Sequence, residues 1–170
     1  MLAALAIAIA LAAGACTGKP KSKGAGTVAR LGTAPLVDRT PGQFDADLAT
    51  LKGRVVVINF WASWCAPCRT ETPGLERVSR AFAGKAVTFI GVDASDQRSA
   101  AARFLNDKGV TYASVYDQKG IYGGIASHWQ VASLPQTWLL AKDGSRALRI
   151  PRPVTETELS ARISQLLSAA

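Results

Sequence analysis

The chain has 170 residues, of which 48% are hydrophobic and 19% are charged. This length suits one domain of ordinary size with an additional segment, and the apolar content can form a packed core without disulfide staples or metals. The net charge of +8 is scattered along the chain apart from a small cluster near the N-terminus, with no Lys/Arg run interleaved with aromatic residues. The composition therefore argues against nucleic-acid binding and favours a solvated basic surface near an anionic membrane.

The first 16 residues predict a signal for export. Residues 1–15 carry no polar side chain, and they are too short to span a bilayer, which needs about 20 apolar residues. Residues 13–16, AGAC, resemble a bacterial lipobox, in which Cys16 is acylated and becomes the first residue of the mature protein. Ala13 stands where Leu is usual, and no basic residue precedes the apolar run. These departures leave open a soluble secreted protein, an uncleaved anchor, and a start codon further upstream.

Residues 17–34 predict a flexible basic linker, because Gly, Pro, Ser and Lys dominate and no apolar periodicity is present. If Cys16 is acylated, the lysines of this segment lie close to anionic headgroups. A merely soluble linker explains the composition equally well. We expect the folded domain to cover residues 35–170.

The first half of this domain predicts two buried strands joined by a helix. Residues 55–60, VVVINF, form the continuous β-branched run expected of a strand buried on both faces. Apolar residues recur at helical spacing over residues 65–82, and a second buried strand follows at about 86–92. Parallel strands with a helix between them form a right-handed βαβ unit.

The second half predicts shorter elements and a final helix. Thr155 and Glu158 match a capping box at the start of that last helix. Its buried stripe consists of Leu159, Ile163, Leu166 and Leu167. The other elements are a helix at about 98–108, strands near 113–116, 138–140 and 147–150, and a hairpin turn at 142–144. The fold class is α/β with a central mixed sheet.

A C-x-x-C motif, Cys65 and Cys68, opens the first helix directly after a buried strand. Backbone N–H groups and the helix dipole favour negative charge at this position, which lowers the pKa of a thiol there. We expect Cys65, at the helix cap, to be exposed and to attack, and Cys68, one turn deeper, to resolve the mixed disulfide. Pro67 stiffens the turn between them. The motif predicts an enzyme that needs no cofactor beyond its redox-active disulfide.

Two other interpretations of the motif are weaker. A purely structural disulfide across two residues closes a very short loop and stabilises little. Zinc normally takes four ligands, and His128 is the only histidine of the chain. We therefore predict no metal site.

The segment 60–69, FWASWCAPCR, resembles the active-site segment of thioredoxin-like proteins. The closer likeness is to the membrane-anchored TlpA/ResA type of extracytoplasmic disulfide reductases. Residues 68–73, CRTETP, match that family's C-x-x-E-x-P continuation, and Leu134–Pro135 stands at its cis-proline. The resemblance covers about residues 35–170. It implies a thioredoxin-like fold with an extra helix and strand between the βαβ unit and the cis-proline.

The resemblance also implies where a substrate chain docks. Pro135 is expected in the cis form, facing the disulfide, so that the backbone before it pairs with an extended substrate. The family usually has Thr after this proline, whereas Gln136 follows it here, which puts the substrate contacts in doubt. The residues expected to border the substrate are Trp64, Ala66, Pro67 and Leu134.

Proton transfer is expected to fall to Glu71. Asn59 stands where cytoplasmic thioredoxins hold a buried Asp that helps to move protons, and an amide cannot relay a proton in that way. Glu71, one turn beyond Cys68, is the best candidate for general acid–base catalysis, and similar proteins carry a partly buried Glu here that tunes the cysteine pKa values. The alternative is a solvated Glu paired with Arg69 or Arg77.

Three further aromatic or titratable residues stand near these motifs. Trp61 is expected to pack in the core. His128 and Trp129 precede the proline segment and are candidates for the border of a substrate groove, although a lone His is more often structural.

Together these features predict a membrane-tethered thiol–disulfide oxidoreductase on the outer face of the cell membrane. The resemblance implies a reductase of exported proteins, often serving cytochrome c maturation by reducing the heme-binding cysteines of the apoprotein. A membrane electron donor would recycle it. We expect a monomer without a nucleic-acid partner.

Alternative functions remain on the same fold. A disulfide-donating oxidase is the nearest, because the reduction potential depends on thiolate stabilisation in the folded site. A copper metallochaperone fits less well, since copper carriers of this fold tend to have C-x-x-x-C spacing. A peroxidase usually carries its reactive cysteine in a different context.

Overall fold

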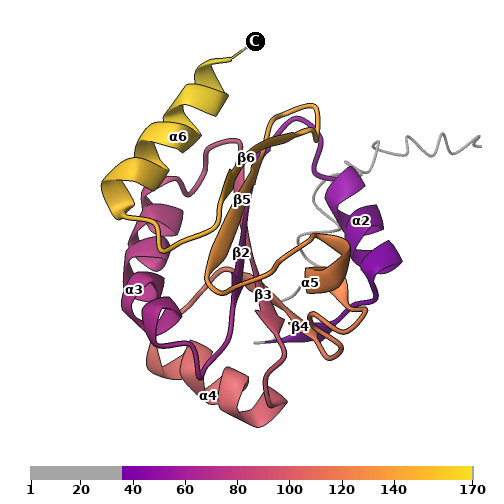
Figure 1. The fold of residues 1–170 in the computed structure, drawn as a ribbon. Coiled ribbons are helices and arrows are strands. Elements are labelled where there is room, and N and C mark those ends of the chain that lie inside the picture. The colour runs from indigo at the N-terminus through magenta and orange to yellow at the C-terminus, as the bar shows by residue number, and fades with distance from the viewer. Residues whose placement is uncertain (1–35, 170) are drawn as a thin grey trace, which may run out of the picture.

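The computed structural model describes residues 36–169, so the predicted signal sequence, the linker and Cys16 lie outside the described residues. The described part is built on a six-stranded sheet with the strand order β1-β4-β3-β2-β5-β6. Helices cover both faces of this sheet (Figure 1). The predicted α/β class with a central mixed sheet is confirmed. Within this part of the chain, none of the helices is long and apolar enough to cross a membrane.

Strands and helices alternate along most of the chain. The strands are β1 (Val37–Asp38), β2 (Val55–Trp61), β3 (Val87–Ala94), β4 (Ala113–Asp117), β5 (Gln136–Leu140) and β6 (Arg146–Ile150). The helices are α2 (Pro41–Ala49), α3 (Ala66–Ala81), α4 (Arg98–Asp107), α5 (Ile125–His128) and α6 (Glu156–Ser168). Strands β1 to β4 pair in parallel, whereas β5 is antiparallel to β2 and β6 is antiparallel to β5.

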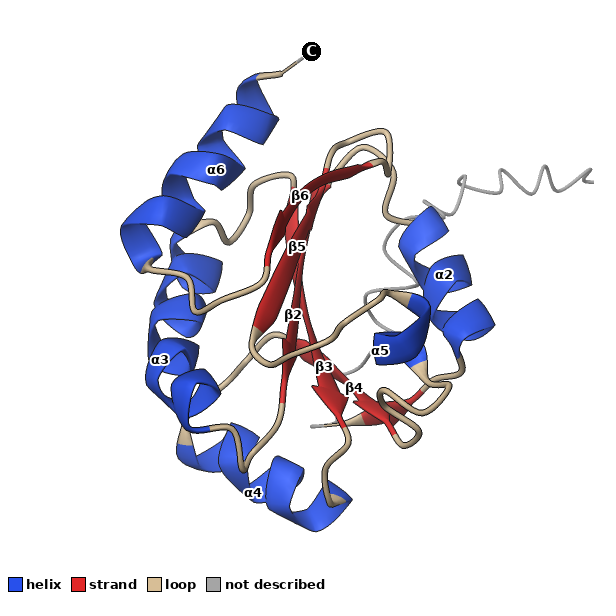
Figure 2. Ribbon diagram, in the orientation of Figure 1, coloured by secondary structure: helices blue, strands red, loops and turns tan. Residues whose placement is uncertain are grey.

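Each face of the sheet has its own apolar core. Helices α2 and α5 lie on one face, and α3, α4 and α6 lie on the other (Figure 2). Successive residues of β2 alternate between the two cores: Ile58 packs on the α2 side, and Val57 packs on the α3 side. All seven residues of β2 are buried, which explains the β-branched run with which it begins, residues 55–58. On α6, Leu159 and Ile163 are fully buried, while Leu166 and Leu167 pack at the edge of the core.

Helix α2 is absent from the elements expected from the sequence. Thr40 and Gln43 form a complete capping box: Thr40 Oγ1 accepts from the Gln43 backbone N–H at 3.3 Å, and Gln43 Oε1 accepts from the Thr40 N–H at 3.0 Å. Pro41 occupies the first helical turn, where its missing N–H costs nothing. Phe44 and Leu48, one turn apart, bury the inner face of the helix.

At α6 only half of the predicted capping box forms. Thr155 Oγ1 accepts from the Glu158 backbone N–H at 3.2 Å, as a cap requires. The Glu158 carboxylate does not return to Thr155, because both of its oxygens accept from the Arg152 guanidinium at 2.9 Å. A two-pronged ion pair of this kind is stronger than a single bond to a neutral N–H.

Candidate active site

The turn between β2 and α3 carries a disulfide between Cys65 and Cys68. Cys65 is the N-cap residue of α3, and its Sγ accepts a hydrogen bond from the Cys68 backbone N–H at 3.3 Å. The sulfur of Cys65 therefore lies at the positive end of a 16-residue helix. This position stabilises a thiolate when the disulfide is opened.

Both cysteines are buried in the disulfide form. Cys65 is 4% exposed and Cys68 is 0% exposed, so the expectation that Cys65 is exposed is wrong. Cys65 belongs to a packed cluster that includes Trp61, Ala62 and, at its edge, Leu134. The order of accessibility nevertheless remains as expected, with Cys68 the deeper of the two.

The Leu134–Pro135 segment lies beside this turn. Its peptide bond is cis, in the form that the resemblance implied. The residues that follow are in register with β2: Gln136 pairs with Phe60, which places Pro135 next to the end of β2 and the disulfide turn. Gln136 is fully buried, and its Oε1 accepts from Arg149 at 3.0 Å.

Glu71 lies one turn beyond Cys68 and is also buried. One carboxylate oxygen accepts from Asn59 Nδ2 at 2.9 Å, and the other accepts from the Val154 backbone N–H at 2.9 Å. Burial raises the pKa of the Glu71 carboxyl above its ordinary value, and the two hydrogen bonds oppose that effect. A carboxyl whose protonated and ionised forms are brought closer in energy is suited to take up and release protons.

The alternative of a solvated Glu71 paired with an arginine is wrong. Arg77 forms its ion pair with Glu156 at 2.5 Å, and Arg69 donates to the Ser63 carbonyl at 3.1 Å. Both arginines lie on the outside of α3, whereas Glu71 faces the sheet.

Asn59 is a neutral partner for Glu71. Its Nδ2 also donates to Thr137 Oγ1 at 3.1 Å, and its Oδ1 has no hydrogen-bond partner among the described residues. An amide presents a donor on one side and an acceptor on the other. Asn59 can therefore donate to the carboxylate and, after turning over, accept from the carboxylic acid. An Asp at the same place would add a second negative charge.

A pocket of about 430 Å³ opens beside Glu71, between α3 and the segment that leads into α6. Pro67, Glu71 and Val154 are among its lining residues. The pocket thus reaches from the C-x-x-C turn to the buried carboxyl.

The residues predicted to border a substrate differ in exposure. Ala66 and Pro67 are exposed on the first turn of α3, and Leu134 is half-buried. These three side chains and the disulfide lie at the same edge of the sheet, where β2 ends and β5 begins.

An exposed apolar rim adjoins this edge. Trp64 is 62% exposed, and its indole N–H donates to the Ser95 carbonyl at 3.0 Å. Ile121 and Tyr122, also exposed, belong to a turn that meets the same residue, since the Ile121 N–H donates to Ser95 Oγ at 3.4 Å. Gly120 permits the approach, because a Cβ there would lie 2.0 Å from that oxygen. This rim was not predicted from the sequence, although two large apolar residues inside a glycine-rich turn are a signal for it.

The remaining aromatic residues belong to the cores. Trp61 is buried, as expected, and its ring lies 4.9 Å from that of Phe104. Trp129 is buried on the α2 side of the sheet, and His128 Nε2 lies 2.8 Å from Asp45 Oδ2. His128 and Trp129 thus belong with α2 and not with the disulfide.

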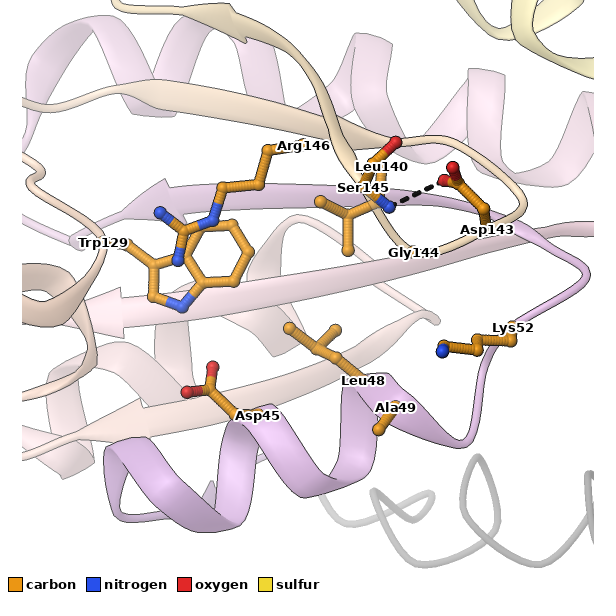
Figure 3. Close-up of a pocket in the computed structure, with 10 residues that line it drawn as sticks. All are labelled: Asp45, Leu48, Ala49, Lys52, Trp129, Leu140, Asp143, Gly144, Ser145 and Arg146. Carbon is orange, nitrogen blue, oxygen red and sulfur yellow. Dashed lines mark hydrogen bonds between the residues drawn. The ribbon is translucent and has the colours of Figure 1, made fainter.

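A second pocket, of about 500 Å³, lies between α2 and the β5–β6 hairpin. Figure 3 shows the Arg146 guanidinium over the Trp129 ring, 3.9 Å from its centroid, and Asp143 accepting from the Ser145 N–H. Leu140, which lines this pocket, pairs with Val56 at the start of β2. The pocket therefore lies toward the opposite end of the sheet from the disulfide. Within residues 36–169, no group of three or more His, Cys, Asp or Glu side chains is placed to hold a metal ion.

A family model and individual relatives both relate this chain to thiol–disulfide oxidoreductases. The sequence model of the Redoxin family matches residues 25–151. The thiol:disulfide interchange protein HelX of Rhodobacter capsulatus is 35% identical over 124 residues, 73% of this chain and 66% of HelX. The thiol-disulfide oxidoreductase ResA of Bacillus thuringiensis is 32% identical over 124 residues, 71% of this chain and 68% of ResA. The chain thus spans about two thirds of the length of each curated relative.

Solved structures are similar as well. A secreted disulfide oxidoreductase of Mycobacterium tuberculosis, homologous to E. coli DsbE, has a TM-score of 0.62 and 28% identity, covering 69% of this chain and 85% of that one. This similarity confirms the predicted thioredoxin-like fold.

Proposed function

The chain belongs to the redoxin family, with thiol–disulfide oxidoreductases of the ResA type among its relatives, and from this premise we propose that it is an extracytoplasmic reductase of protein disulfides. The observation that carries the proposal is the Cys65–Cys68 disulfide at the N-terminus of α3 with Glu71 buried one turn below it. Cys65, Cys68, Glu71 and Pro135 are the proposed catalytic residues.

The reaction begins with both cysteines reduced. The Cys65 thiolate attacks one sulfur of a client disulfide, so that a Cys65–client bond forms and the second client sulfur leaves as a thiolate that takes up a proton. Cys68 then attacks the Cys65 sulfur and releases the first client thiol. The client has gained two electrons and two protons, and the protein is left with the Cys65–Cys68 disulfide.

Glu71 handles the proton of the second step. Residues three apart on a helix are neighbours, and Cys68 and Glu71 are both buried, so Glu71 is the carboxylate proposed to take the thiol proton as the Cys68 sulfur attacks. Asn59 and the Val154 N–H hold the carboxylate in place. The pocket beside Glu71 returns the proton to solvent.

The client chain docks across the edge of the sheet. The backbone of Leu134, before Pro135, pairs with an extended client segment, and Trp64, Ala66 and Pro67 border it. The exposed rim of Trp64, Ile121 and Tyr122 supplies apolar area for side chains of an unfolded client. An unfolded client is the form in which a buried disulfide becomes accessible.

The N-terminal sequence and the relatives support a proposal for the cellular setting. Acylation of Cys16 would tether the protein to the outer face of the cell membrane, with the linker spanning the gap to the folded domain. A membrane electron donor recycles the disulfide, and the clients are exported proteins with paired cysteines. Apocytochrome c, with its C-x-x-C-H motif, is the proposed client, and the protein acts as a monomer.

Reduction of a synthetic peptide tests this proposal. The protein is reduced, freed of reductant and mixed with an oxidised peptide that carries C-x-x-C-H. We expect one peptide disulfide to open for each Cys65–Cys68 disulfide that forms, as measured by thiol-trapping mass spectrometry. The double variant Cys65→Ser, Cys68→Ser is the control and leaves the peptide oxidised. Oxidation of a reduced peptide by the oxidised protein, without the reverse reaction, would instead identify a disulfide donor.

A further inference from the structure

Asp93 is a buried carboxyl that the proposed reaction does not use. It lies in β3, in register with Trp61 of β2 and Tyr116 of β4, and is 0% exposed. Neither of its oxygens accepts a hydrogen bond from a donor among the described residues. An ionised carboxylate is costly in such a place, because nothing replaces the water that it loses.

A second carboxyl, that of Asp96, interacts with Asp93. The other charged groups facing it are the Asp117 carboxylate of β4 and the Arg98 guanidinium of α4. Burial above all, and then the two carboxylates, raise the pKa of Asp93 to about 9, while Arg98 acts in the opposite direction. Arg98 is itself engaged in an ion pair with Asp38 of β1. A protonated Asp93 can donate to Asp96, whereas two ionised carboxyls repel each other.

Asp96 itself is hydrogen-bonded to the turn that leads into the disulfide. Its Oδ2 accepts from the Ser63 backbone N–H at 2.5 Å, two residues before Cys65. Its backbone carbonyl accepts from the Tyr116 hydroxyl at 3.0 Å, which fixes the loop itself. In the same turn the Cys65 N–H donates to the Ala62 carbonyl. Asp96 thus holds the turn that carries Cys65 by its Ser63 end.

We propose that Asp93 is a positioning residue for the exchange reaction at Cys65: a proton shared between Asp93 and Asp96 keeps Asp96 on the Ser63 N–H and so fixes the turn that presents Cys65. Asp93 touches neither sulfur and acts only through Asp96. Loss of the proton leaves two negative charges side by side, one of them on the fully buried Asp93 and the other on the half-buried Asp96. The Asp96 carboxyl then moves away from Ser63, and Cys65 loses its fixed place at the positive end of α3. The inference deepens the proposed function, since the reaction that it serves is the one proposed above.

The test follows the ionisation of Cys65 in the reduced full-length chain. Its rate of alkylation is measured between about pH 6 and pH 10, by mass spectrometry of the peptide that carries Cys65. The variants are Asp93→Asn and Asp93→Ala, and the exposed Asp107→Asn is the matched control. Hydrogen exchange of the Ser63 N–H is measured on the same samples.

An Asn side chain donates to Asp96 at every pH, whereas Ala donates at none. We expect Asp93→Asn to keep the wild-type midpoint of Cys65 ionisation and to lose a second inflection near pH 9 that wild type shows. We expect Asp93→Ala to raise the midpoint of Cys65 ionisation by about one pH unit, which leaves about tenfold less Cys65 thiolate at neutral pH. The same variant is expected to expose the Ser63 N–H to hydrogen exchange.

Either of two results would overturn the proposal. In one, Asp93→Asn shifts the midpoint of Cys65 ionisation as far as Asp93→Ala does; in the other, neither variant shifts it. Alkylation of Cys65 requires no client protein, so it can be measured even if the protein fails to reduce the C-x-x-C-H peptide. Failure of the proposed function and failure of the Asp93 inference are therefore told apart.

Discussion

With Cys68 replaced by serine, the protein is expected to remain covalently bound to its client. Cys65 still attacks, but the mixed disulfide has no second cysteine to resolve it, so turnover of the peptide falls to the uncatalysed rate. The experiment uses a Cys16→Ser background, in which Cys65 is the only cysteine left in the chain. The adduct is measured by intact mass, and its release by added dithiothreitol shows that the bond is a disulfide.

The matched variant is Cys65→Ser in the same background. Because Cys68 is fully buried beneath Cys65, we expect it to form no adduct. A Cys65→Ser protein that traps the client while the Cys68→Ser protein does not would reverse the roles of the two cysteines.

Replacing Glu71 by glutamine is expected to slow peptide reduction by on the order of 100-fold, the lower end of what a general acid–base group contributes. The shape of the site is retained, because Asn59 can turn its unpartnered Oδ1 toward the new amide. Loss of the nearby negative charge is also expected to lower the pKa of the Cys68 thiol in the reduced protein. Single-turnover kinetics across a range of pH measure both effects.

Glu156→Gln is the control for this substitution. Glu156 lines the same pocket but is exposed and paired with Arg77. We expect its pH profile to match that of wild type. An unchanged rate in Glu71→Gln would remove the carboxyl from the proposed proton transfer.

The same substitution affects stability in a pH-dependent manner. Burial raises the pKa of Glu71 above its ordinary 4.5, so over the interval above that value the folded protein holds a proton that the unfolded chain releases. The free energy of unfolding of wild type therefore falls as the pH rises through this interval. Urea titrations over this pH interval should show that the decrease in the free energy of unfolding is smaller in Glu71→Gln, because the contribution of Glu71 is missing.

Much of the fold could be predicted because the relevant signals are local. The β-branched run of β2 marks a strand buried on both faces, and the C-x-x-C after it marks the start of α3. Helix α2 was not predicted, but it could have been, since Thr40, Pro41 and Gln43 form a capping signature at its start. Strand β1 has only two residues and α5 only four. Elements this short carry no periodicity to detect.

The site was predictable only in part, because its contacts join distant segments. Asn59 and Glu71 each carried a sequence signal, but their hydrogen bond depends on how α3 packs on the sheet. The other partner of Glu71, the Val154 N–H, is 83 residues away along the chain and is a backbone group that no side-chain pattern marks. The burial of Cys65 likewise comes from side chains of other elements, such as Leu134.

The reduction potential of the Cys65–Cys68 pair tests the central claim most directly. The protein is equilibrated with redox buffers of known potential, and the fraction reduced is measured by thiol trapping and mass spectrometry. The proposed reductase function predicts a value near or below about −230 mV, within the range of thioredoxins and glutaredoxins. A value near about −120 mV, as in strongly oxidising proteins of this fold, would identify a disulfide donor and contradict it.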